Sequence, residues 1–156
     1  MDNDFIKNAV SEMFDEIVKI RRDIHMNPEL GFDEIEKSKK VREFLLENNI
    51  EVREAAGTGI VGILKNGSGN VAACRADMDA LPIIEENNTE YKSRINGKMH
   101  ACGHDAHTAI QLGTAKFLSD NLDKWSGTVK FIFQPAEETT GGAKPMIEEG
   151  VLEDPK

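Results

Sequence analysis

The spacing of apolar residues predicts two helices in the first third of the chain. From Phe5 to about Ile24, apolar residues recur close to every third or fourth position, which is typical of a helix. The segment "NPELGF" interrupts this pattern with a proline and a glycine. A second helix is predicted from Asp33, a suitable N-cap residue, to about Asn48. Its buried face is expected to consist of Ile35, Val41, Phe44 and Leu45.

The pattern then changes to short runs rich in Val and Ile. The segments "IEVREA", "GIVGILKN" and "NVAACRADM" are separated by glycines and predict three strands. The turn "NGSGN", residues 66–70, predicts that the last two strands form a hairpin. Helical spacing returns over 107–122, and a fourth strand is predicted over 127–135. The segment "AKPMIEEGVL" predicts a short helix, and the polar stretch 85–98 predicts a loop. This order of elements predicts an α/β sandwich with a central mixed sheet.

Length, charge and cysteine content narrow the class of protein. The 156 residues suffice for one domain with a core, and no internal repeat is visible. A net charge of −9 argues against nucleic acid or an anionic membrane as a partner, because both attract basic surfaces. The chain shows neither a signal peptide nor a long apolar run. With only two cysteines, we expect a cytoplasmic protein with reduced thiols.

Three segments carry residues suited to chemistry, and each lies close to the end of a predicted strand. The first is "RADMDALP", which contains Asp77 and Asp79. On an extended chain, two residues at this spacing point to the same side. Paired carboxylates bind metal, orient a histidine or act as acid and base. The alternative is a pair of turn-forming aspartates before a proline.

The second segment is "KMHACGHDAHTA". If its first half is extended, His100, Cys102 and His104 lie on one face, where thiolate and imidazole suit a zinc-like ion. A cysteine nucleophile with a histidine base is the alternative. His107 is expected near the start of the next helix as a supporting residue, and His25 is expected to be structural.

The third segment, "FQPAEETTGGAKPM", places two adjacent glutamates directly after a predicted strand. Adjacent side chains on irregular backbone point in different directions. Glu137 and Glu138 therefore suit a division of work in which one binds metal and the other activates water. Two solvated glutamates in a loop are the simpler alternative.

Together with "RRDIHMNPELGFDE", these segments resemble the M20 metallopeptidase family, in the order in which the family carries them. The resemblance is closest to its amidohydrolase branch, which includes N-acyl-amino-acid, hippurate and indoleacetyl-amino-acid hydrolases. It implies two divalent metal ions (zinc, manganese or cobalt). It further implies that Cys102, His104 and Glu138 are metal ligands, that Glu137 is the general base, and that Asp79 orients a ligand. Asp77 stands where other branches carry a ligating histidine.

Members of that family are longer than this chain, and they carry further ligand histidines and a capping and dimerisation domain. We therefore expect residues 1–156 to form the N-terminal part of the catalytic domain, without the capping domain. The substrate implied is a small N-acyl amino acid. Weak metal binding, little activity of the chain alone, and self-association through an exposed sheet edge are expected. A non-catalytic binding or scaffold domain and a thiol hydrolase are the rival hypotheses.

Overall fold

The computed structural model describes all residues, 1–156, and contains the helices and strands that the sequence predicts. Each predicted element is present with ends that differ by a few residues. The helices are α1 (Asn3–Met26), α2 (Ile35–Glu47), α3 (His104–Asp120) and α4 (Ala143–Glu148), with a 3-10 turn at Leu122–Lys124. The strands are β1 (Glu51–Ala55), β2 (Gly59–Asn66), β3 (Val71–Asp77) and β4 (Gly127–Gln134). The polar stretch 85–98 is a loop, as expected.

The four strands form one mixed sheet in the order β1-β2-β4-β3. The β1–β2 and β2–β4 pairs are antiparallel, whereas β3 runs parallel to β4. The predicted hairpin between the second and third strands is therefore wrong, because β4 lies between them. The reason is burial: β4 carries Phe131 and Phe133, which are fully buried, whereas most of β3 is exposed. The strand that buries more apolar surface takes the central position.

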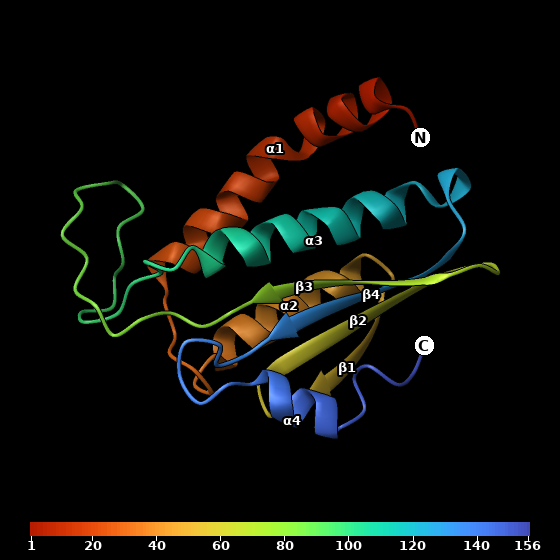
Figure 1. Cartoon of the computed structure of the whole chain (residues 1–156). Coiled ribbons are helices and arrows are strands. Elements are labelled where there is room, and N and C mark those ends of the chain that lie inside the picture. The colour runs from red at the N-terminus through yellow and green to blue at the C-terminus, as the bar shows by residue number, and fades with distance from the viewer.

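Alternating residues of the sheet form cores on its two faces. One face carries Ile60, Leu64, Phe131 and Phe133, which pack against the apolar residues of α2 and α3. The opposite face carries Val61, Ile63 and Ile132, which pack with Met146 of α4. Figure 1 shows α1 lying across α3, on the side of α3 away from the sheet. The expected α/β architecture with a mixed central sheet is confirmed. None of the helices has the length and apolar character needed to cross a membrane.

The start of α2 differs from the expectation. Asp33 does not cap it; instead the carboxylate of Glu29 accepts hydrogen bonds from the backbone amides of Glu36 and Lys37, at 3.0 and 2.8 Å. Ile35 is 65% exposed and is not part of the buried face. The chain buries Glu34 and Lys37 there, although both side chains are ionisable. The side chains of Glu34 and Lys37 contact the segments that contain the candidate site residues.

Candidate metal centre

The three segments with candidate chemistry meet at one edge of the sheet. Because β3 and β4 are parallel, Asp77 and Gln134 end their strands side by side, with paired Cα positions. The helix α3 begins at the same edge with His104 (Figure 1). Gly103, with φ of 87°, adopts the left-handed conformation that the turn into α3 requires. This is the carboxyl edge of parallel strands, where α/β proteins place their sites.

His104 is the residue around which the others gather. It is buried, and its Nδ1 lies 3.0 Å from the carbonyl oxygen of Asp79 and 3.3 Å from Asp79 Oδ1. Its other nitrogen, Nε2, faces three carboxylates: Asp77 Oδ2 at 3.7 Å, and one oxygen each of Glu137 and Glu138 at 3.9 Å. With the Nδ1 proton donated to Asp79, Nε2 is the nitrogen that faces the carboxylates and that a cation would use.

The residues present fit a divalent metal ion. Ligand atoms of Cys102, His104 and Glu138 all lie within 4.8 Å of one another. Thiolate, imidazole and carboxylate are the ligands that zinc and similar borderline ions take in proteins. The distances from Nε2 to the carboxylates exceed those of hydrogen bonds, so direct hydrogen bonding does not hold these groups together. A cation between them would relieve the repulsion among the carboxylates.

Asp79 connects two of the segments. Its Oδ2 accepts a hydrogen bond from the backbone amide of Glu138 at 2.8 Å, and its side chain is fully buried. Burial alone would raise the pKa of Asp79, but hydrogen bonds from His104 and from the backbone amides of Glu138 and Glu137 lower it. Asp79 therefore stays ionised and holds both the imidazole and the glutamate loop in place.

The acidic surroundings also act on His104 itself. Burial would lower the pKa of its imidazole, but contacts with Asp79 and Cys102 and the charge of Asp77 raise this pKa to about 10. The imidazole thus carries a proton that a bound cation would have to displace.

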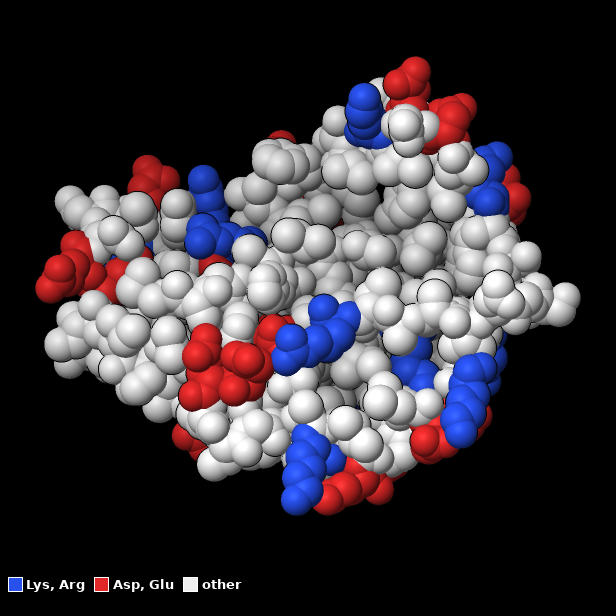
Figure 2. Space-filling view, viewed as in Figure 1, with Lys and Arg blue, Asp and Glu red and all other residues white.

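Figure 2 shows acidic side chains gathered over the loop that follows β4, with basic side chains beside them. Glu137 and Glu138 lie in that loop, and their side chains are 41% and 30% exposed.

Two buried residues at the start of α2 support the site and were missed by the sequence prediction: Glu34, which directly precedes the helix, and Lys37. Glu34 accepts hydrogen bonds from Thr58 Oγ1 at 2.7 Å and from the amide of Ala136 at 2.8 Å. Ala136 has a positive φ of 51°, which is strained for a residue with a side chain. The bond from Ala136 to Glu34 helps to hold this conformation, which directs the following Glu137 toward the site. Burial raises the pKa of Glu34.

Lys37 joins the other two segments. Its Nζ donates a hydrogen bond to the carbonyl oxygen of Met78 at 2.6 Å and lies 2.8 Å from His100 Nε2. Met78 stands between Asp77 and Asp79 in the sequence. Burial lowers the pKa of Lys37 to about 8. Burial and the nearby charge of Lys37 lower the pKa of His100 to about 2, so His100 is neutral and accepts the hydrogen bond from Lys37. In the sequence Lys37 is one of several charged residues of a predicted helix, and nothing there indicates that it connects Met78 with His100.

The segment "HACGH" is not extended, so the condition under which His100, Cys102 and His104 would share one face is not met. Residues 101–103 form a turn, and His104 already belongs to α3. His100 faces Lys37 and has no place among the proposed ligands, whereas Cys102 remains beside His104, with its Sγ 3.6 Å from the carbonyl oxygen of Asp79. Gly103, directly before His104, permits this turn. The alternation of His and Cys in the sequence does not reveal the turn.

The expected structural role of His25 agrees with its contacts. His25 is buried, and its two ring nitrogens lie 2.7 Å from Asp105 Oδ2 and 3.2 Å from Glu85 Oε1. Arg21 Nε also lies 2.7 Å from Asp105 Oδ2. This network ties α1 to the start of α3 and to the loop that contains Glu85. His25 is not among the possible metal ligands.

Comparison with known proteins places this arrangement in a family. The model of peptidase family M20/M25/M40 matches residues 73–156, which include all the proposed ligands. The chain therefore belongs to the M20 family of peptidases. The fold agrees: the YXEP protein of Bacillus subtilis, a dinuclear metal-binding peptidase of this family, superimposes with a TM-score of 0.87 and 45% identity. That superposition covers 92% of this chain and 41% of the Bacillus protein.

Two relatives of known name show how much of a family member is present. The thermostable carboxypeptidase 2 of Saccharolobus solfataricus is 52% identical over 94% of this chain. The hippurate hydrolase of Campylobacter jejuni is 50% identical, also over 94% of this chain. In both cases the match covers 39% of the relative's own length. Both relatives are hydrolases, and the chain spans well under half of each.

Proposed function

We propose that this chain is the N-terminal part of the catalytic domain of a metal-dependent amidohydrolase. The observation that carries the proposal is the convergence of Cys102, His104 and Glu138 within ligand distance, beside the carboxylate of Glu137. In the proposal, the first three residues hold a divalent ion, and the complete enzyme holds two. Zinc, manganese and cobalt all suit such a donor set. Further ligands and a capping domain would come from sequence outside residues 1–156.

The proposed substrate is an N-acyl amino acid. The name of the hippurate hydrolase relative supports this class, because hippurate is an amide between an aromatic acid and glycine. The name of the carboxypeptidase relative points to peptide amides next to a free carboxyl terminus. Both substrates present an amide carbonyl and a free carboxylate. The acyl group and the amino acid are left open by the proposal.

The residues of this chain divide the hydrolysis between them. When bound, a divalent ion would lower the pKa of water and polarise the amide carbonyl. Glu137 would take a proton from the attacking water and deliver it to the leaving amine. Asp79 would keep His104 in the orientation in which Nε2 faces the ion. Glu34 and Lys37 would hold the Ala136 and Met78 backbones, and thereby the spacing of the site.

A thiol hydrolase that uses Cys102 and His104 is the rival enzyme, and a non-catalytic scaffold is the rival of another class. The carboxylates around His104 Nε2 favour metal, since a thiol nucleophile has no use for three of them. Two further expectations stay predictions: a cytoplasmic location, and self-association through β3, which is an exposed edge of the sheet.

A hybrid enzyme tests the proposal. Residues 1–156 would replace the matching part of the Campylobacter jejuni hippurate hydrolase, which is 50% identical, and hydrolysis of hippurate would be measured. We expect the hybrid to hydrolyse hippurate, a chelator to abolish the activity, and added zinc, manganese or cobalt to restore it. The chain alone is expected to show little or no turnover.

Each rival predicts another outcome for the hybrid. Activity that survives thorough chelation but is lost on alkylation of Cys102 would favour the thiol hydrolase. A folded hybrid that binds metal but never hydrolyses the substrate would favour the scaffold. Efficient hydrolysis by residues 1–156 alone would contradict the proposal that essential ligands lie outside this chain.

A further inference from the structure

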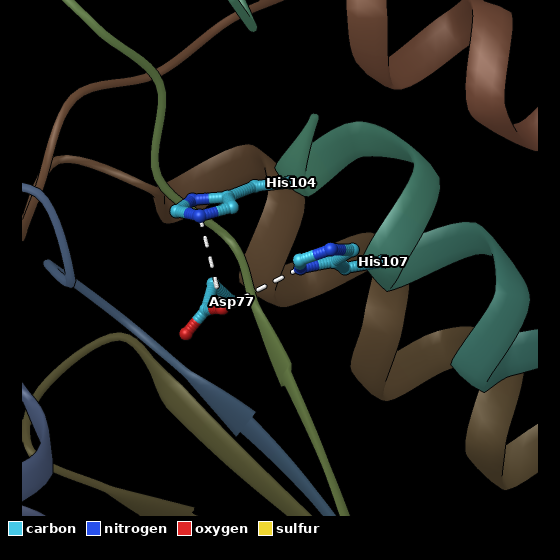
Figure 3. A group of neighbouring side chains, drawn as sticks. All are labelled: Asp77, His104 and His107. Atoms are coloured by element: carbon cyan, nitrogen blue, oxygen red, sulfur yellow. Dashed lines mark ion pairs between the residues drawn. The ribbon is translucent and has the colours of Figure 1, made fainter. Parts of the chain in front are cut away.

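A second group of possible metal ligands lies on the other side of His104. Figure 3 shows Asp77 at the end of β3 facing His104 and His107, both of which lie in the first turn of α3. The Oδ2 atom of Asp77 is 3.7 Å from His104 Nε2 and 3.5 Å from His107 Nδ1. One ligand atom from each of the three residues can be chosen so that all lie within 4.8 Å of one another.

These separations suit an ion better than they suit hydrogen bonds. A nitrogen and an oxygen that share a proton approach to about 2.7–3.2 Å, which is closer than either contact. Two ligands about 2.1 Å from the same tetrahedral ion are separated by about 3.4 Å. The contacts of 3.5 and 3.7 Å are near that value, so small side-chain movements would suffice for coordination.

Neighbouring residues fix the carboxylate of Asp77 so that one of its oxygens is free to bind an ion. Its side chain is only 6% exposed, and Oδ1 is paired with the guanidinium of Arg75. The backbone carbonyl of Asp77 accepts a hydrogen bond from Thr108 Oγ1 at 2.9 Å, which fixes the end of β3 against α3. Oδ2 therefore points at the two imidazoles. His107 is 53% exposed, so an ion has access from solvent.

The two groups share one residue, His104. His104 Nδ1 lies against Asp79, so Nε2, which faces both Asp77 and Glu138, is the nitrogen left for an ion in either group. A nitrogen lone pair binds one ion at a time. We propose that Asp77, His104 and His107 form a second, sulfur-free position for a divalent transition ion, which is an alternative to the position at Cys102. The shared use of His104 rests on the proposed function, but the ligands Asp77 and His107 do not.

Cobalt binding to variants of the 156-residue chain tests this. A thiolate ligand gives cobalt(II) an intense near-ultraviolet charge-transfer band, whereas nitrogen and oxygen ligands give only the weaker visible bands. We expect wild type to bind one cobalt per chain with the charge-transfer band. Cys102→Ala should lose that band but keep saturable binding with visible bands. Cys102→Ala/His107→Ala should lose saturable binding altogether.

A matched control separates ligation from damage to α3. Ile110 lies on the same helix and is 61% exposed, so Cys102→Ala/Ile110→Ala should bind cobalt as Cys102→Ala does. Circular dichroism melts would show that every variant is folded. The inference is overturned if folded Cys102→Ala binds no more cobalt than the double variant with His107→Ala. It is also overturned if wild type binds two ions that both require His104.

The outcomes for this inference and for the proposed function differ. A charge-transfer band in wild type, with no cobalt binding by Cys102→Ala, would leave the proposed centre standing and remove the second position. Binding that needs His107 but shows no charge-transfer band in wild type would do the opposite. His107→Ala alone should keep the charge-transfer band, because Cys102, His104 and Glu138 are intact.

Discussion

Replacing Glu137 with Gln is expected to lower kcat of the hybrid hydrolase by about 10²–10⁴-fold, which is the usual contribution of a general base. Glutamine has the same shape but cannot take the proton from water. Glu137 lies 3.9 Å from His104 Nε2, at the edge of the proposed centre and half exposed to solvent. Its loss should therefore leave metal content unchanged, while kcat falls at constant metal occupancy.

Two comparison variants define this result. Glu138→Gln should weaken metal binding, because Glu138 belongs to the proposed ligand group. Glu90→Gln changes an exposed glutamate in the loop after β3 and should alter neither kcat nor metal content. Hydrolysis of hippurate and metal content by atomic emission would be measured for each. Unchanged kcat in Glu137→Gln, or a loss of metal equal to that of Glu138→Gln, would contradict the assigned role.

Replacing Lys37 with Met is expected to change how the free energy of unfolding depends on pH. Burial lowers the pKa of Lys37 from the ordinary 10.5 to about 8. Between these pH values the unfolded chain carries a proton on Lys37 that the folded chain lacks, so this group makes the wild type more stable as pH rises. One pKa unit corresponds to about 1.4 kcal/mol. The stability of wild type relative to Lys37→Met should therefore rise by on the order of 3 kcal/mol across this window.

Urea denaturation at several pH values between 8 and 10.5 would measure this difference. Lys39→Met is the matched control, because Lys39 lies on the same helix and is exposed. The stability difference between wild type and Lys39→Met should stay constant over the same range. Parallel pH profiles for wild type and Lys37→Met would mean that Lys37 is not the buried, hydrogen-bonded amine that joins Met78 to His100.

The elements of the fold could be predicted because they depend on local patterns. Apolar residues spaced for helices, and runs of Val and Ile between glycines, are properties of short windows of sequence. The order of strands is not local. A turn sequence at 66–70 favours a hairpin, but it cannot show that β4, which begins only at Gly127, inserts between β2 and β3. That insertion depends on which strand buries more apolar surface.

The candidate site was predictable to the extent that its residues belong to recognisable segments. Asp79, Cys102, His104, Glu137 and Glu138 lie in motifs of the family, and the fold brings them together. The residues that brace the site were not predictable from pattern. Glu34 and Lys37 lie at the start of a charged helix, where burial of an ionisable group is uncommon. Their roles depend on contacts with residues far away in the sequence, such as Ala136 and His100.

The central claim is that Cys102, His104 and Glu138 hold a divalent ion at the carboxyl edge of the sheet. Anomalous X-ray diffraction at the zinc edge, from crystals of the chain grown with zinc, tests it most directly. The account predicts an anomalous peak about 2.3 Å from Cys102 Sγ and about 2.0–2.2 Å from His104 Nε2 and an oxygen of Glu138. Well-diffracting crystals with no peak within bonding distance of Cys102 and Glu138 would contradict it.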